Sequence, residues 1–93
     1  MLETLDDLRK SIDNIDNAIV AMFAERFKVT DRVGYYKAAN GLTAKDPARE
    51  AIQFQRMSEL ASQYGVDPEF AASYLAAVIE RVVRNHEQIA ENT

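Results

Sequence analysis

The feature that most constrains this chain is a long apolar stripe near its N-terminal end. Its members are separated alternately by three and four residues, the heptad spacing of a helix that packs along one face. Thr4 and Asp7 supply a cap at its start, so the pattern predicts one helix from about residue 5 to about residue 39, ending near Asn40-Gly41. The stripe consists of Leu5, Leu8, Ile12, Ile15, Ile19, Met22, Arg26, Val29, Val33 and Tyr36.

Two Asp-Pro pairs predict the starts of two further helices. Asp46-Pro47 and Asp67-Pro68 each place a capping side chain before a proline at the first helical position. Gly65 predicts the end of the second helix, and the third runs to about residue 90. No segment alternates apolar and polar residues as a half-buried strand would. The sequence therefore predicts a single all-α domain over residues 1–93, with one long helix, two shorter ones and a loop before Asp46.

The first of these helices is too long for its two partners. About 35 residues at a rise of ~1.5 Å per residue span roughly 50 Å, and the other helices are shorter. They can hardly cover the whole stripe within one chain, so we expect a second copy to cover it in an intertwined homodimer. A three-helix bundle with a frayed first helix is the alternative.

Composition excludes several classes of function. The 93 residues include no cysteine and one histidine, so no metal site is expected. A formal net charge of -4 argues against a nucleic-acid surface. No apolar run approaches the ~18–20 residues of a membrane span, and the N-terminus lacks the profile of a signal peptide. We therefore expect a cytoplasmic protein that binds neither nucleic acid nor membrane.

Arg26 interrupts the stripe between Met22 and Val29, where the spacing calls for an apolar side chain. A buried guanidinium is costly unless it is paired and hydrogen-bonded. Arg26 can form a structural ion pair with an acid such as Glu25 or Asp31, or it can bind an anion at the core of the dimer. Spacing alone leaves both readings open.

Other residues favour the anion site. Lys37 follows Arg26 by three helical turns, ~16 Å along the axis, on nearly the same face. Gly34 either opens room on that face or is a tolerated packing glycine. Arg49 lies in the first turn of the second helix, where backbone N–H groups favour anions, although a lone arginine there is usually a solvated residue. Arg9 is ~25 Å from Arg26 along the helix, so it can share a small ligand only from an antiparallel partner chain. An ordinary surface charge is the other reading of Arg9.

This ordered pattern resembles the helical (AroQ-class) chorismate mutases over nearly the whole chain. The resemblance implies an enzyme that rearranges chorismate to prephenate without metal or cofactor, in the shikimate pathway to aromatic amino acids. It also implies a homodimer, and it leaves open a complex with a larger enzyme of that pathway. The residues that carry it are Leu8-Arg9, Ile12, Ile15-Asp16, Ala24-Glu25-Arg26, Val33-Gly34-x-x-Lys37 and Asp46-x-x-Arg49-Glu50.

The resemblance also assigns roles to individual side chains. Arg26 and Arg49, with Arg9 of the other subunit, would hold the two carboxylates of the substrate. Lys37 and His86 would donate to the enol ether oxygen, and with Arg26 they would form the catalytic set. As the C–O bond breaks, negative charge grows on that oxygen, and a fixed cation stabilises the transition state preferentially.

The remaining assignments concern the ring of the substrate and two departures from the family pattern. Asp46 and Glu50 would lie by the ring, with Glu50 near its C4 hydroxyl, under a loop over residues 40–46. His86 stands where the family commonly has glutamine or sometimes glutamate, and it can donate either neutral or protonated. A lone histidine on an apolar helix face is otherwise usually a satisfied core residue, and the aligned position favours the donor. Val82 stands at a substrate-binding position where some relatives have serine, and core packing is its favoured interpretation.

Two other functions stay open at this point. The family includes isochorismate pyruvate-lyases, which form salicylate and pyruvate from a substrate that carries its ring hydroxyl at C2. Asp46 and Glu50 favour chorismate, whereas the absence of a serine at Val82 weakens that inference. A non-catalytic, ligand-binding helical dimer is the second alternative, although Arg26 and Lys37 are both retained.

Overall fold

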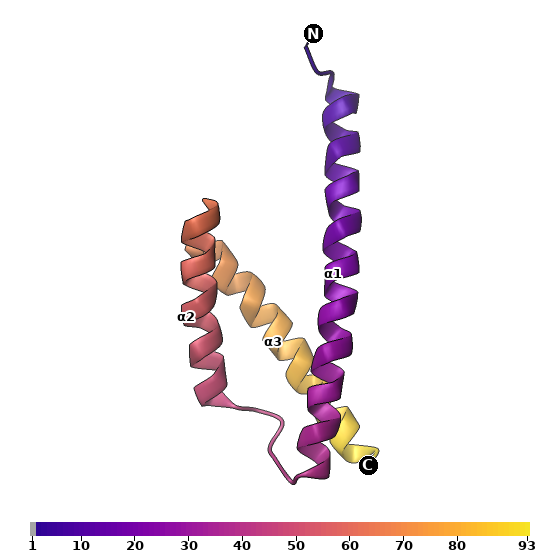
Figure 1. Cartoon of the computed structure of the whole chain (residues 1–93), viewed down its shortest axis with the longest axis vertical. Coiled ribbons are helices and arrows are strands. Elements are labelled where there is room, and N and C mark those ends of the chain that lie inside the picture. The colour runs from indigo at the N-terminus through magenta and orange to yellow at the C-terminus, as the bar shows by residue number, and fades with distance from the viewer. Residues whose placement is uncertain (1) are drawn as a thin grey trace. The chain divides into compact units, whose positions relative to one another are not determined.

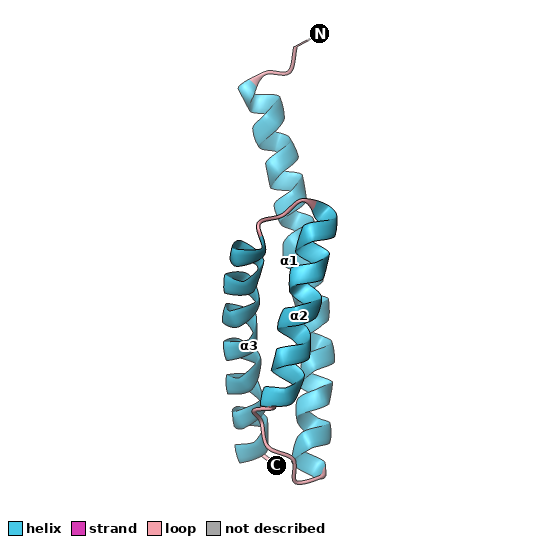
Figure 2. Cartoon of the chain, turned by 90° about the vertical axis from the view of Figure 1, so that its left-hand side faces the viewer, coloured by secondary structure: helices cyan, strands magenta, loops and turns pink. Residues whose placement is uncertain are grey.

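The computed structural model describes residues 2–93 as three helices and their connections. The helices are α1 (Leu5–Ala39), α2 (Pro47–Tyr64) and α3 (Pro68–Glu91), in this order along the chain (Figure 1). Figure 2 shows only helix and loop, with no strand among residues 2–93. The all-α prediction of one long and two shorter helices is confirmed.

Local capping explains where the helices begin and end. The backbone N–H of Asp7 donates to Oγ1 of Thr4 at 3.1 Å, and the N–H of Thr4 donates back to Oδ2 of Asp7 at 3.1 Å. The side chain of Asp67 accepts from the N–H of Glu69 at 2.9 Å. Gly65 closes α2 with a φ of 70°, a left-handed conformation that glycine adopts without steric cost. These reciprocal bonds satisfy backbone groups that the helix ends would otherwise leave unpaired.

Contacts within the chain divide it into two units, Met1–Thr30 and Asp31–Thr93, and α1 runs through both. Among residues 2–30 of the first unit, none is buried. The apolar stripe is open to solvent there, with exposed fractions from 45% at Leu8 to 65% at Met22. A single chain therefore leaves uncovered the face that the heptad spacing marks for packing.

The second unit holds the buried apolar side chains. The turn after α2 reverses the chain, so α2 and α3 run in opposite directions and pack against each other (Figure 1). The core consists of Ala61 on α2 and of Ala71, Leu75 and Val78 on α3. Leu75 is the most buried of them, with 1% of its surface exposed.

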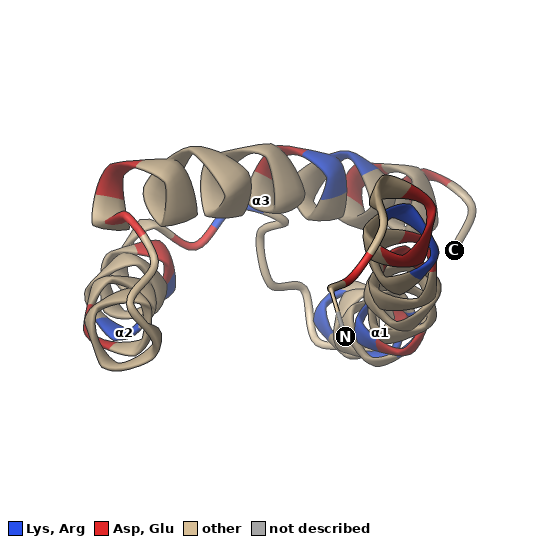
Figure 3. Cartoon of the chain, turned by 90° about the horizontal axis from the view of Figure 1, so that it is seen from above, with Lys and Arg blue, Asp and Glu red and all other residues tan. Residues whose placement is uncertain are grey.

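The charged side chains do not separate by sign onto different helices. Figure 3 shows acidic and basic residues interspersed along each of the three helices. Within residues 2–93, no helix has the length and apolarity that crossing a membrane requires.

Leu75→Ala tests the packing of the second unit. We expect it to lower the free energy of unfolding by about 2–5 kcal/mol, because it removes a buried side chain and leaves a cavity. Chemical denaturation at one fixed protein concentration measures the change. Leu2→Ala is the matched control, because Leu2 is 93% exposed and its loss should cost less than about 0.5 kcal/mol. Equal effects of the two variants would contradict this description of the core.

Candidate active site

Lys37 and His86 are two residues that the sequence marked for chemistry, and the fold brings their side chains together from distant parts of the chain. Lys37 is half-buried in the last turn of α1. Its Nζ donates to the carbonyl oxygen of Ala44 at 2.9 Å and lies 3.5 Å from Nδ1 of His86. An ammonium group has donors and no acceptor, so this contact is favourable only when Nδ1 carries a lone pair. The contact is therefore a hydrogen bond only in the tautomer that keeps the proton on Nε2.

His86 owes its position to the buried face of α3. It follows Leu75 and Val78 along that face and is itself only 4% exposed. A polar side chain at such a depth needs hydrogen-bonding partners, and among residues 2–93 no buried side-chain nitrogen or oxygen lacks one. The imidazole is thus a fixed group rather than a mobile surface side chain.

Gly34 allows α1 and α3 to approach each other beside this pair. A Cβ atom at position 34 would lie 2.7 Å from Cδ2 of His86 and 2.9 Å from Cδ1 of Ile89. Both distances are shorter than carbon atoms tolerate, so any other residue would displace the imidazole ring. The sequence indicated that Gly34 opens room on this face, and the room is occupied by His86.

The loop after α1 brings the two predicted ring-facing acids to the start of α2. Oδ1 of Asp46 accepts from the backbone N–H of Arg49 at 3.1 Å, so Asp46 is the N-cap of α2. Glu50, in the first turn, pairs with Lys45 at 2.9 Å. Arg49 itself is exposed at this helix start, where its charge faces solvent.

The other predicted site residues are two arginines of α1 and one apolar residue of α3. Arg9 is exposed and Arg26 is half-buried, and both belong to the first unit of the chain. Val82 is half-buried on α3, one turn before His86. Within the second unit, the structure thus joins Lys37 to His86 and sets Asp46, Arg49 and Glu50 on one helix start.

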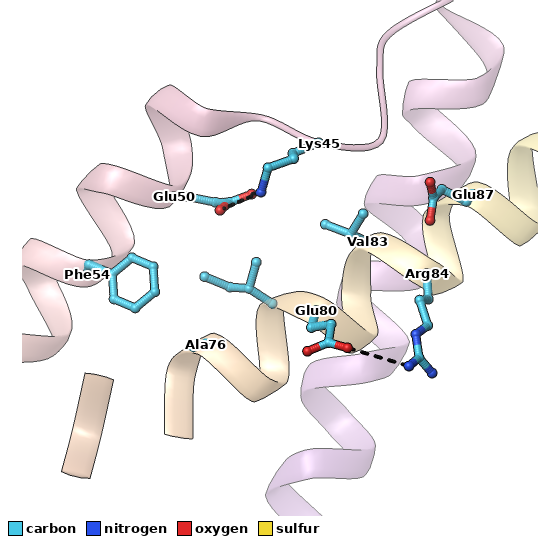
Figure 4. A pocket seen from close by; sticks show the side chains of 9 residues that line it. Lys45, Glu50, Phe54, Ala76, Glu80, Val83, Arg84 and Glu87 are labelled. Carbon is cyan, nitrogen blue, oxygen red and sulfur yellow. Dashed lines mark hydrogen bonds and ion pairs between the residues drawn. The ribbon is translucent and has the colours of Figure 1, made fainter. Parts of the chain in front are cut away.

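A cavity of about 320 Å³ lies between α2 and α3 (Figure 4). Its charged lining is mixed, and Arg84 pairs with Glu80 at 3.4 Å. The volume is at the small end of what ligand pockets offer. The two basic and three acidic side chains do not by themselves make a site for a dianion. The lining residues are Lys45, Glu50, Phe54, Ala76, Ile79, Glu80, Val83, Arg84 and Glu87.

Sequence reasoning missed Lys45 and Phe54 as part of this region. Lys45 carries no helical periodicity, because it lies in the loop before the cap of α2. Its spacing of five residues from Glu50 is not one at which side chains meet on a helix. Only the loop conformation brings them together. Among residues 2–93, no cluster of three or more potential ligand side chains is placed to hold a metal ion.

The sequence matches one described family over most of its length. A family described as chorismate mutase type II matches residues 8–87, a segment that includes all three helices in large part. The chain belongs to the chorismate mutase type II family, whose members are isomerases. The predicted family is confirmed.

Individual relatives support the same assignment. The chain is 32% identical over 93 residues to a chorismate mutase of Methanocaldococcus jannaschii, covering 100% of this chain and 94% of that protein. It is 28% identical over 92 residues to a T-protein of Haemophilus influenzae, of which it spans 24%. It is also 34% identical over 76 residues, 80% of this chain, to a bifunctional chorismate mutase/prephenate dehydratase of Aquifex aeolicus, of which it spans 21%.

Gly34→Ala tests the close approach beside His86. Overpacking costs about 1–3 kcal/mol, whereas alanine returns about 1 kcal/mol of helix propensity. We therefore expect a net loss of about 1 kcal/mol in the free energy of unfolding, measured by chemical denaturation. The control is Ala24→Gly, the reverse exchange at an exposed position of α1, which should cost about 1 kcal/mol from propensity alone. A Gly34→Ala variant more stable than the wild type would contradict the contact.

Proposed function

We propose that this chain converts chorismate to prephenate, with Lys37 as the central catalytic group. The observation that carries the proposal is the ammonium of Lys37, half-buried and held by the Ala44 carbonyl and His86. Membership of the family and the match to a full-length chorismate mutase support the same reaction. The rearrangement is unimolecular and pericyclic, so it needs no nucleophile or base. Holding the substrate in its compact conformer supplies proximity, and a fixed cation stabilises the charge that grows on the ether oxygen.

The substrate carboxylates require further cations. We assign them to Arg26, Arg49 and the partner subunit's Arg9. In this proposal the exposure of Arg9 and Arg49 in a single chain fits side chains that complete a site only with substrate and a second subunit. Asp46 and Glu50 then lie by the ring, with Glu50 accepting from the C4 hydroxyl. Val82 packs against the substrate without a polar contact.

His86 takes the place of the second donor to the ether oxygen. In the proposed site an N–H of the imidazole donates to this oxygen, which the ring can do in its neutral or its protonated form.

The substrate assay decides among the functions. Purified protein is incubated with chorismate and with isochorismate separately, and the products are identified. We expect prephenate from chorismate. Salicylate from isochorismate alone would assign the chain to the pyruvate-lyases, and no product from either would indicate a ligand-binding dimer.

Lys37→Ala should lower kcat by about 10²–10³, because it removes a donor that acts mainly in the transition state. KM should change much less. Steady-state kinetics with chorismate measure both constants. Lys28→Ala is the control, since Lys28 is an exposed lysine of the same helix, paired with Glu25 at 3.0 Å. If Lys37→Ala raised KM and left kcat unchanged, the assigned role would be wrong.

His86→Gln and His86→Leu separate hydrogen bonding from packing. The amide of glutamine can accept from Lys37 and donate to the ether oxygen, so we expect kcat within about tenfold of the wild type. Leucine can do neither, and kcat should fall by about 10²-fold or more. Equal kcat values for the two variants, both folded by circular dichroism, would show that His86 serves packing alone.

The uncovered stripe on α1 supports the second part of the proposal, an intertwined homodimer. Ile12 and Ile15 are 55% and 59% exposed in one chain, at the spacing of a coiled-coil seam. The regular repeat of apolar side chains along a helix of 35 residues matches a second copy of the same helix. A passing contact with an unrelated surface would not require such a repeat.

Mixing two variants tests the trans origin of Arg9. Arg9→Ala and Arg26→Ala chains are unfolded, combined in equal amounts and refolded together. If each site takes Arg26 from one chain and Arg9 from the other, half of the dimers are mixed and half of their sites are intact. About a quarter of wild-type activity should return. No recovery, with mixed dimers shown by native mass spectrometry, would place both arginines in one chain.

The longer relatives raise a final part of the proposal. One of them joins chorismate mutase to prephenate dehydratase in a single protein, of which this chain matches 21%. An association of this chain with a larger enzyme of the same pathway would likewise bring two activities together. We expect such an association to change kcat/KM for chorismate when the partner is added.

A further inference from the structure

Lys45 makes a two-pronged ion pair with the acid that the proposed function places beside the ring of the substrate. Its Nζ lies 3.0 Å from Oε1 and 2.9 Å from Oε2 of Glu50. The two side chains differ in burial: that of Lys45 is 62% exposed, whereas that of Glu50 is only 19% exposed. Lys45 thus reaches from solvent to a carboxylate that is largely withdrawn from it (Figure 4).

The surroundings of Glu50 explain why a cation is needed there. The same cavity wall carries the apolar side chains of Phe54 and Val83 and two further acids, Glu80 and Glu87. A carboxylate in such a place loses hydration and is repelled by like charges, unless a cation offsets both effects. The other basic residue of the wall, Arg84, is engaged with Glu80 at 3.4 Å.

The position of Lys45 in the chain adds a second constraint. The preceding residue, Ala44, accepts the hydrogen bond from Lys37 through its backbone carbonyl at 2.9 Å. Two consecutive residues therefore hold the ammonium of Lys37 and the carboxylate of Glu50. Because neighbouring Cα atoms are about 3.8 Å apart, the two contacts start from adjacent points of the loop.

The ion pair leaves Glu50 able to act on a ligand. A carboxylate offers about four acceptor sites on its two oxygens, and a lysine ammonium at equal distance from both uses about one on each. The remaining sites can accept from a hydroxyl group. Lys45 can therefore stay in place while substrate binds.

We infer that Lys45 is a positioning residue, which acts through Glu50 on the ring hydroxyl of the substrate. It keeps the carboxylate turned toward the cavity through contacts to both oxygens, so that Glu50 is an acceptor of defined direction. This inference rests on the proposed function, since it deepens the role of Glu50 in that site. It also makes Lys45 a determinant of specificity for the position of the hydroxyl group.

The test compares Lys45→Met with the wild type on two substrates: chorismate and an analogue that lacks the C4 hydroxyl. We expect Lys45→Met to lower kcat/KM for chorismate by about tenfold, mainly through KM. Its kcat/KM for the analogue should stay within about twofold of the wild type, because Glu50 has no hydroxyl to accept from. In a Glu50→Gln background, Lys45→Met should cause no further loss on chorismate.

Two further variants separate positioning from folding. Lys45→Arg keeps the charge, and its forked guanidinium can contact both carboxylate oxygens, so kcat/KM should stay within about twofold of the wild type. Lys28→Met removes the cation from an exposed Lys–Glu pair at 3.0 Å and should change nothing. Circular dichroism and thermal unfolding verify that Lys45→Met is folded.

Each outcome bears on the inference. Unchanged kcat/KM for chorismate in a folded Lys45→Met variant would overturn it, while the proposed function would stand. An equal loss on chorismate and the analogue would show that Lys45 only supports the loop, and would also overturn it. If the wild type turned over neither substrate, the proposed function would fail and this role of Lys45 with it.

Discussion

The hydrogen bond from Lys37 to the Ala44 carbonyl, with His86 on its other side, is the interaction on which the second unit depends. A half-buried ammonium must have acceptors, because each unmet donor costs more than a surface hydrogen bond returns. Its two acceptors come from the loop and from α3. One side chain thus ties the end of α1 to both following parts of the chain. The same cation is the group that the proposed function assigns to the ether oxygen.

That arrangement requires small and rigid neighbours. Gly34 gives up helix propensity, but the absence of a Cβ atom lets His86 lie against α1. The imidazole is held in turn by the buried face of α3, where Leu75 is almost fully enclosed. Packing against apolar side chains fixes the polar group, and the polar group fixes the cation. The glycine in α1 thus lowers the intrinsic stability of that helix and allows a defined position of the Lys37 side chain.

The sequence predicts those features that depend on neighbours along the chain. Helix starts at Asp46 and Asp67 and the end at Gly65 follow from capping, which acts over three or four residues. The pair formed by Lys37 and His86 spans 49 positions, and only the family pattern pointed to it. The contacts made by the loop could not be predicted. An exposed loop lysine such as Lys45 belongs to no periodic pattern, so its spacing in the sequence does not indicate its partner. The α1 stripe is likewise left exposed by the single chain, and its cover by a second copy is part of the proposal.

The reaction itself explains why so few polar groups can suffice. A pericyclic rearrangement moves no proton, so its catalyst must only hold charges in place while the substrate folds. Mutase and lyase chemistry on related substrates then share the cations and differ in where the ring hydroxyl lies. The contact that reads this hydroxyl is a carboxylate, and a carboxylate gives direction only if its own orientation is fixed. In the proposed site Lys45 contacts both oxygens of Glu50 and supplies that fixation, so a loop residue contributes to the choice between the two reactions.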